Sequence, residues 1–349
     1  QEIATGAGKT IITAALCQLV EPYGRTLTIV PNKSLVTQTE EDFLACNLDT
    51  GVYYGDRKEI GRYNTIATWQ SLNVLEKRSK DEHSTEFKEA MQGINTVIID
   101  EVHMAKADVL KRMLTGPFAH CGIRWGLTGT VPKADYEFMG IKCAIGDVIN
   151  KIPAKELQEK GVLANCNVNI VQTVETKMFS NYQEELKWLT TDDRRMSWIA
   201  KTIDSISTTG NTLILVDRIS AGEMLEKKLP GSVFISGSTK NPDRKEHYDE
   251  VSTAKNKIII ATYGVASVGI NIPRIFNLVL IEPGKSFVRV IQSIGRGIRK
   301  AEDKDHVEIW DLTSSCKFAK RHLTQRKKFY KEANYPYNIE KINYENSFT

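Results

Sequence analysis

A run of small residues near the start of the chain ends in a lysine and a threonine, Ala4-Thr5-Gly6-Ala7-Gly8-Lys9-Thr10. Small residues let backbone N–H groups approach phosphate oxygens, and an apolar helix after them would point its N-terminus at the same phosphates. In such a loop the lysine reaches the β- and γ-phosphates and the threonine hydroxyl binds Mg²⁺. A glycine-capped turn would use the same residues, and Ile3 stands where the usual pattern has glycine. The run predicts an ATP site made of Thr5, Gly6, Ala7, Gly8, Lys9 and Thr10, with Lys9 also catalytic.

Two carboxylates follow an apolar run in the first half of the chain. Thr96–Ile99 reads as a strand, and Asp100 and Glu101 stand at its carboxyl end. In a Walker B site the first carboxylate holds Mg²⁺ and the second polarises the attacking water. We therefore predict Asp100, together with Thr10, as a metal ligand and Glu101 as a catalytic residue.

Two neighbouring segments would sense the state of the nucleotide. His103 stands two residues after Glu101, and Thr128-Gly129-Thr130 follows a short apolar run 28 residues after Asp100. Read alone, the histidine could be an ordinary core or surface residue and the threonines an ordinary turn. Next to the acidic pair, we interpret His103, Thr128, Gly129 and Thr130 as coupling residues.

A glutamine and two arginines late in the chain could act on the terminal phosphate. Arg296 and Arg299 are three residues apart and would share one helical face. Gln292 lies four residues before Arg296. A planar, permanently charged guanidinium suits the charge of a phosphoryl transition state. We predict all three as catalytic, supplied from a second lobe so that hydrolysis requires closure; a basic surface helix is the alternative. The small-residue loop 263–271 precedes them, and we expect Gly269 to contact the nucleotide.

Strands and helices alternate along the chain. The strand-like runs are continuously apolar, as in a parallel sheet covered on both faces by helices. This pattern predicts the α/β class, with ligands at the carboxyl ends of the strands. It occurs in two blocks, so we expect a first domain over 1–150, a linker over 151–164 with a short glycine-capped helix, a second domain over 165–319 and a basic C-terminal tail over 320–349.

Hydroxyl and amide side chains follow two of the predicted strands in the first block. Such groups suit phosphate contacts that carry no sequence information. Each segment could also be an ordinary loop. As a set they predict DNA contacts at Pro31, Asn32, Lys33, Gln38, Thr68, Gln70 and Ser71.

Composition excludes several classes of protein. The chain has 349 residues, 41% of them hydrophobic, and no run of eighteen apolar residues, so we expect no membrane span and a cytoplasmic location. Its six cysteines lack zinc-like spacing and predict isolated reduced thiols. The net charge is +4, and from Lys320 onward seven Lys or Arg stand against three Glu. Because the chain enters the phosphate loop almost at once, we also expect an upstream region in the parent protein.

These segments, in this order, resemble superfamily 2 helicases. The match runs from motif I at Ile3–Thr10 through motif II at Asp100–His103 to motif VI at Gln292–Arg299. The sequence Asp-Glu-Val-His differs from the DEAD box of many RNA helicases. Segments such as Tyr182–Leu186 and Ile309–Leu312 resemble the phage branch-migration helicases of the UvsW type.

The resemblance implies two tandem RecA-like domains, ATP and Mg²⁺ as cofactors, and additional DNA contacts at Arg218 and Thr262. It also implies an ATP-dependent DNA helicase acting on forked or four-way DNA, in the host cytoplasm if phage-encoded. Three alternatives stay open: a duplex translocase without strand separation, an RNA helicase, and a nucleotide-gated DNA clamp without turnover. Asn271, where motif V commonly has an acidic residue, is a departure, and no protein partner is indicated.

Overall fold

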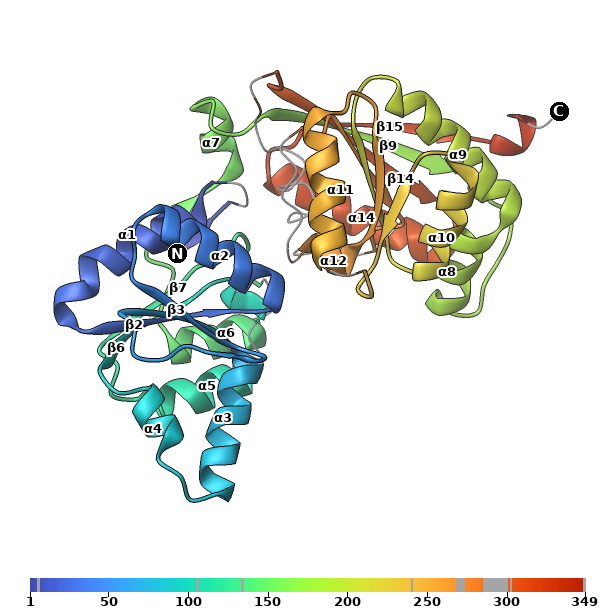
Figure 1. Cartoon of the computed structure of the whole chain (residues 1–349). Coiled ribbons are helices and arrows are strands. Elements are labelled where there is room, and N and C mark those ends of the chain that lie inside the picture. The colour runs from blue at the N-terminus through green and yellow to red at the C-terminus, as the bar shows by residue number, and fades with distance from the viewer. Residues whose placement is uncertain are drawn as a thin grey trace. The chain divides into compact units, whose positions relative to one another are not determined.

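The computed structural model describes residues 1–4, 7–104, 107–132, 135–239, 241–267, 274–284, 301 and 303–347. The chain divides into two compact units, Gln1–Ile152 and Pro153–Thr349, and each is a mostly parallel sheet flanked by helices (Figure 1). The predicted α/β class is therefore confirmed. The division falls inside the predicted linker, which contributes β8 (Lys151–Ile152) to the first unit and α7 (Ala154–Glu159) to the second.

The first unit has a six-stranded sheet of order β4-β3-β5-β2-β6-β7, in which only the β3–β4 pair is antiparallel. Its strands are β2 (Arg25–Val30), β3 (Thr50–Tyr54), β4 (Arg57–Lys58), β5 (Asn64–Thr68), β6 (Ile94–Ile99) and β7 (Ile123–Gly126). The short strand β1 (Glu2–Ile3) pairs with β8, and the N–H of Ile3 donates to the carbonyl of Thr128 at 2.8 Å. β1 therefore lies beside the chain that leaves β7, and it leads directly into the phosphate loop.

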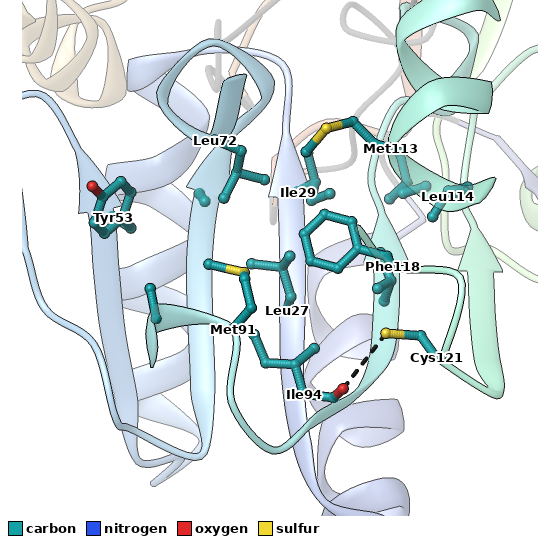
Figure 2. Close-up of a cluster of buried hydrophobic side chains, with 14 of the residues drawn as sticks. Leu27, Ile29, Tyr53, Leu72, Met91, Ile94, Met113, Leu114, Phe118 and Cys121 are labelled. Carbon is teal, nitrogen blue, oxygen red and sulfur yellow. Dashed lines mark hydrogen bonds between the residues drawn. The ribbon is translucent and has the colours of Figure 1, made fainter. Parts of the chain in front are cut away.

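Helices cover both faces of this sheet, with α1 and α2 on one face and α3 to α6 on the other (Figure 1). They are α1 (Lys9–Val20), α2 (Lys33–Ala45), α3 (Trp69–Asp81), α4 (Glu86–Ala90), α5 (Ala107–Thr115) and α6 (Asp135–Ala144), with 3₁₀ turns η1 (Glu21–Tyr23) and η2 (Val102–Met104). Figure 2 shows Leu27 and Ile29 of β2 turned toward Leu72, Met113 and Phe118, all fully buried. Full burial of each such side chain contributes about 1.5–3 kcal/mol.

The second unit has a seven-stranded, wholly parallel sheet of order β11-β12-β10-β13-β14-β9-β15. Its strands are β9 (Asn165–Thr173), β10 (Thr212–Val216), β11 (Val233–Ile235), β12 (Ile258–Thr262), β13 (Asn277–Ile281), β14 (His306–Ser314) and β15 (Tyr337–Ile342). The segment predicted as a basic tail is part of this fold, because it forms α14 (Lys317–Glu332) and the edge strand β15. Most of its cations lie on the surface of that helix, but Arg326 is buried, and the charged positions between the buried residues conceal the helix face.

The other helices among the described residues of the second unit are α8 (Tyr182–Thr191), α9 (Asp193–Ser207), α10 (Ile219–Lys228), α11 (Asn241–Thr253) and α12 (Tyr263–Ser267), with the 3₁₀ turn η3 (Tyr344–Ser347). Side chains alternate along β14, so neighbouring residues serve opposite faces. Leu312 packs into the core beneath α9 and α10, whereas Asp311 bonds to α14. α14 therefore covers the face opposite to α9.

Two further expectations concern the whole chain. All six cysteines are free thiols, as predicted, and Sγ of Cys121 donates to the carbonyl of Ile94 at 3.5 Å (Figure 2). In the described ranges, no helix combines the length and the apolar character needed to cross a membrane.

Candidate active site

The predicted phosphate loop leads from β1 into α1. Gly8 caps α1 with a φ of 77°, a left-handed backbone that favours glycine, and a Cβ there would meet nothing within 4 Å. The backbone conformation, rather than lack of space, therefore requires glycine. Ala7 and Thr10 are half-buried, while Thr5 and Gly6 lie outside the described residues.

Lys9 and Glu101 meet at the carboxyl edge of the first sheet. Nζ of Lys9 lies 3.4 Å from Oε1 of Glu101, and the two side chains are 9% and 5% exposed. Glu101 has a φ of 48°, and its N–H donates to Oδ1 of Asp100 at 2.9 Å. Left-handed backbone at a residue other than glycine is strained, and such strain is concentrated at functional sites, where the surrounding structure holds it. The fold thus fixes both carboxylates beside the start of α1.

His103 links the acidic pair to the end of β7. Its Nδ1 lies 2.6 Å from Oγ1 of Thr128 and 3.4 Å from Oε2 of Glu101. Thr128 also donates to the carbonyl of Thr130 and accepts from the N–H of the same residue. Burial lowers the pKa of His103, so the ring is neutral at pH 7, and the carboxylate beside Nδ1 favours a proton on that atom. One hydrogen-bonded chain therefore joins three of the predicted coupling residues, with Gly129 between the threonines.

These residues fit a nucleotide that carries Mg²⁺. Lys9 supplies a cation next to small residues, Thr10 a hydroxyl and Asp100 a carboxylate. No group of three or more His, Cys, Asp or Glu in the described part of the chain could hold a metal ion by itself. Magnesium at nucleotide sites takes one or two protein oxygens and completes its shell with phosphates and water. The donor set therefore suits Mg²⁺ bound together with phosphates.

The predicted DNA contacts of the first unit lie at the ends of two paired strands. β2 and β5 run side by side, with Val30 opposite Thr68. Oδ1 of Asn32 accepts from the N–H of Leu35 at 3.0 Å, and Oγ1 of Thr68 accepts from the N–H of Ser71 at 3.3 Å. Both side chains therefore cap the helices that follow. Three other predicted contacts belong to the same two junctions, Pro31, Lys33 and Gln70, whereas Gln38 lies in the second turn of α2.

In the second unit, two predicted DNA contacts lie within the described residues. Arg218 follows β10 and donates from Nη2 to Oε1 of Gln183 at 2.7 Å. Thr262 ends β12, and its Oγ1 accepts from the N–H of Val265 at 3.4 Å. The remaining predicted site residues of this unit lie outside the described ranges, and their roles stay predictions: Gly269, Gln292, Arg296 and Arg299.

The carboxyl edge of the second sheet holds buried charges for which the sequence has no recognisable motif. Nη2 of Arg195 donates to Oε1 of Glu282 at 2.9 Å, and its Nε lies 3.5 Å from Oε1 of Glu175. Oγ1 of Thr313 donates to Oε2 of Glu282 at 3.1 Å. Burial raises the pKa of Glu282 to about 7. Because Arg195 and Glu282 are 87 residues apart, no local spacing could have signalled the pair.

A second buried group fastens α14 to the same edge. Arg326 donates to both carboxylate oxygens of Asp311, at 2.8 and 2.9 Å, and to the carbonyl of Gly284 at 2.8 Å. The hydroxyl of Tyr330 donates to Oδ2 of Asp311 at 2.6 Å. Bidentate arginine–carboxylate pairs are among the strongest polar contacts in proteins. The segment after Gly284 carries the predicted catalytic arginines, so these contacts fix the point where that segment begins.

Known proteins match both units. The family model "Type III restriction enzyme, res subunit" matches residues 2–133, and "Helicase conserved C-terminal domain" matches residues 194–301. The chain is 26% identical over 349 residues to "ATP-dependent DNA helicase uvsW" of Enterobacteria phage T4, covering 94% of this chain and 67% of the relative. It is 24% identical over 362 residues to the factor IIH helicase/translocase subunit XPB/SSL2 of Saccharomyces cerevisiae, covering 96% of this chain and 41% of that relative. It therefore spans two thirds of the first relative and two fifths of the second.

A solved structure supports the architecture. S. cerevisiae Dbp5 bound to RNA and ADP BeF3 matches with a TM-score of 0.68 at 14% identity, covering 99% of this chain and 86% of that one. At that identity the likeness shows the fold, which is two tandem RecA-like domains. The two family models and these relatives together indicate a superfamily 2 helicase, the class of enzyme that couples ATP hydrolysis to DNA unwinding.

Proposed function

We propose that this chain is the motor of an ATP-dependent DNA helicase that acts on branched DNA, at forks and Holliday junctions, during phage replication, recombination and repair. The observation that carries the proposal is the contact of Lys9 with Glu101 next to the His103–Thr128 hydrogen bond. The phage T4 relative, an ATP-dependent DNA helicase, supports the choice of ATP and DNA. The assignment to branched DNA comes from the sequence resemblance alone. A helicase of replicating phage DNA would work in the host cytoplasm.

Each residue of the first unit has a defined role in this proposal. The loop amides and Lys9 bind the phosphates, and Glu101 accepts the proton of the attacking water. Mg²⁺ held by Thr10 and Asp100 would neutralise charge on the phosphates. Because Lys9 lies 3.4 Å from Glu101, the carboxylate and the phosphates compete for one ammonium group. Phosphate binding would therefore redirect Lys9 and leave the Glu101 carboxylate to accept a proton from water.

The second unit would contribute charge stabilisation. Gln292, Arg296 and Arg299 would act on the terminal phosphate, where a guanidinium suits the charge of the transition state. Arg299→Ala should leave ATP affinity nearly intact while turnover collapses. A variant that still hydrolysed ATP at the wild-type rate would remove this role from Arg299.

Glu101→Gln tests the site most directly. It keeps the size and one hydrogen-bond acceptor but cannot take a proton at neutral pH. We expect ATP binding to be retained and phosphate release to fall by roughly 10²-fold or more, the usual effect of losing a general base. Glu82→Gln, at an exposed position at the end of α3, is the matched control and should hydrolyse normally. Wild-type turnover by Glu101→Gln would contradict the assignment.

The substrate is tested by comparing ATPase rates on single-stranded DNA, linear duplex, a fork, a four-way junction and RNA. We expect the largest stimulation with the fork or the junction, accompanied by displacement of a labelled strand. Stimulation by linear duplex without displacement would indicate a translocase. RNA as the best activator would indicate an RNA helicase, and DNA binding without phosphate release would indicate a clamp.

A further inference from the structure

One face of α14 carries a stripe of exposed cations. The helix is 16 residues or about 24 Å long, and at about 3.6 residues per turn all members of the stripe project from one side of it. The opposite side is buried through Ala319, Leu323, Arg326 and Tyr330. We call the exposed stripe the basic face; it consists of Lys317, Lys320, Arg321, Lys328 and Lys331.

The basic face destabilises the helix. Like charges three or four residues apart repel each other, and cations in the first turn oppose the helix dipole. In the described ranges none of the five side chains forms an ion pair. An exposed cation elsewhere in this unit does pair: Lys160 lies 2.6 Å from the carboxylate of Glu156.

Buried contacts offset that cost. The carboxylate of Glu185 accepts from the N–H groups of Phe318 and Ala319, at 3.0 and 2.6 Å, which places a negative charge at the start of α14. Arg326 and Tyr330 hold the middle of the helix to Asp311. A helix that is anchored on one side and self-repelling on the other is suited to a polyanion that would relieve the repulsion.

The N-terminal end of the basic face lies close to a predicted DNA contact. Tyr182, at the start of α8, packs on the rings of His322 and Phe318 in α14, with centroids 4.8 and 6.3 Å away. The next residue, Gln183, accepts from Arg218 at 2.7 Å. The first turn of α8 therefore separates Arg218 from α14, and the two sources of positive charge belong to one region of the unit.

We propose that the basic face of α14 binds the phosphate backbone of duplex DNA. This inference rests on the proposed function and extends the DNA contacts beyond the strand-end motifs. Duplex is favoured over single strands because single-strand platforms stack bases on exposed aromatic rings. On α14, Phe318 and Phe329 are half-buried and Tyr330 is fully buried, so none of them presents an exposed ring for a base. The ring of Phe318 is already covered by Lys317, whose Nζ lies 5.5 Å from the ring centroid.

The test is the salt dependence of binding of the full chain to a fluorescently labelled blunt DNA duplex. Each phosphate contact contributes about 0.9 to the slope of log K against log salt. Lys328→Gln/Lys331→Gln should lower the slope by about two. Lys227→Gln/Lys255→Gln is the matched control: both lysines are exposed, and they lie near the end of α10 and just before β12, at the amino edge of the sheet. It makes the same charge change and should leave the slope unaltered.

An unchanged slope in the α14 variant, or equal losses in both double variants, would overturn the inference. A loss that is as large on single-stranded DNA as on duplex would overturn the assignment to duplex. The DNA-stimulated ATPase activity of the wild type separates failure of this inference from failure of the proposed function. If that activity is present and the slope of the α14 variant is unchanged, only this inference fails. If the wild type neither binds nor responds to DNA, the proposed function fails as well.

Discussion

The two units have the same strand order, and they use the same edge in opposite ways. Five strands of the first sheet, in the order β3-β5-β2-β6-β7, correspond to five of the second, in the order β11-β12-β10-β13-β14. β1 and β8 take the places that β9 and β15 have in the second unit. Glu101 comes just after β6 and Glu282 directly after β13, both with left-handed backbone at φ 48° and 42°. Each faces a cation from a helix between the first two strands of its unit, Lys9 or Arg195.

The difference lies in what stands beside the cation. After β1 the chain continues with small residues, so the neighbour of Lys9 can be a phosphate. After β9 it continues to Glu175, whose carboxylate lies 3.5 Å from Nε of Arg195. The second unit thus supplies from its own chain the negative charge that a nucleotide would supply in the first. In both units the carboxyl edge of the RecA-like sheet brings a cation to a carboxylate. The neighbouring residues decide whether that cation can meet a phosphate or is neutralised by buried carboxylates of its own chain.

The largest difference between the two units should appear when the cation of each is removed. Arg195→Met leaves two buried carboxylates without their shared partner and should destabilise the second unit by about 3–5 kcal/mol. Lys9→Met should abolish hydrolysis while changing stability much less. Urea unfolding and phosphate release measured on both variants test the contrast. Lys228→Met, which removes a more exposed pair with Asp193, is the control and should cost less than about 1 kcal/mol. Equal stability losses at Arg195 and Lys9 would contradict the distinction.

Glu282 should give the second unit a characteristic pH dependence. Its pKa rises from 4.5 to about 7 on folding, so the folded state holds a proton more tightly and stability falls as pH rises between these values. The full effect is about 3 kcal/mol. Glu282→Gln, which keeps an acceptor for Arg195 and can donate from its amide NH2 to the hydroxyl of Thr313, should flatten the profile. Hydrogen exchange of peptides from α9 and β13, measured from about pH 5 to pH 8, would follow this unit alone; an unaltered profile in the variant would contradict the role of Glu282.

The first site could be predicted because its chemistry demands particular residues at close spacing. Lys9 and Thr10 after small residues, and two carboxylates after an apolar strand, leave few other interpretations. The buried charges around Arg195 could not be predicted, because Arg195 and Glu282 are far apart in the sequence and meet only in the folded unit.

α14 was hidden for another reason. An arginine occupies one of its core positions, and Arg326 among buried Ala319, Leu323 and Tyr330 breaks the apolar period that would mark a helix face. The charge count of the segment therefore indicated a tail, whereas the buried partner Asp311 makes it part of the sheet's cover.

His103 should give the first unit a weaker pH dependence of opposite sign. Burial lowers its pKa below 6.5, so stability is complete above that value and is lost as pH falls through the lowered pKa. The charge of Glu101 opposes the effect of burial, which limits its size. His103→Gln should remove the dependence. Hydrogen exchange of the β6 and β7 peptides between about pH 5 and pH 7 measures it; a first unit that became more stable on acidification would show that this histidine is charged in the fold.

The smallest expected effect concerns the strand-end residues, where a structural and a DNA-binding role compete. Asn32 caps α2, so Asn32→Ala should cost about 1 kcal/mol, whereas glycine at an N-cap costs only a few tenths. If the side chain also contacts phosphate, both variants should lose DNA affinity to the same degree. If it serves only as a cap, Asn32→Gly should keep both stability and affinity. Thermal unfolding combined with duplex binding separates these outcomes, because the glycine variant removes the amide while keeping the helix start. Equal loss of affinity in both variants, with stability kept in Asn32→Gly, would assign Asn32 to the DNA.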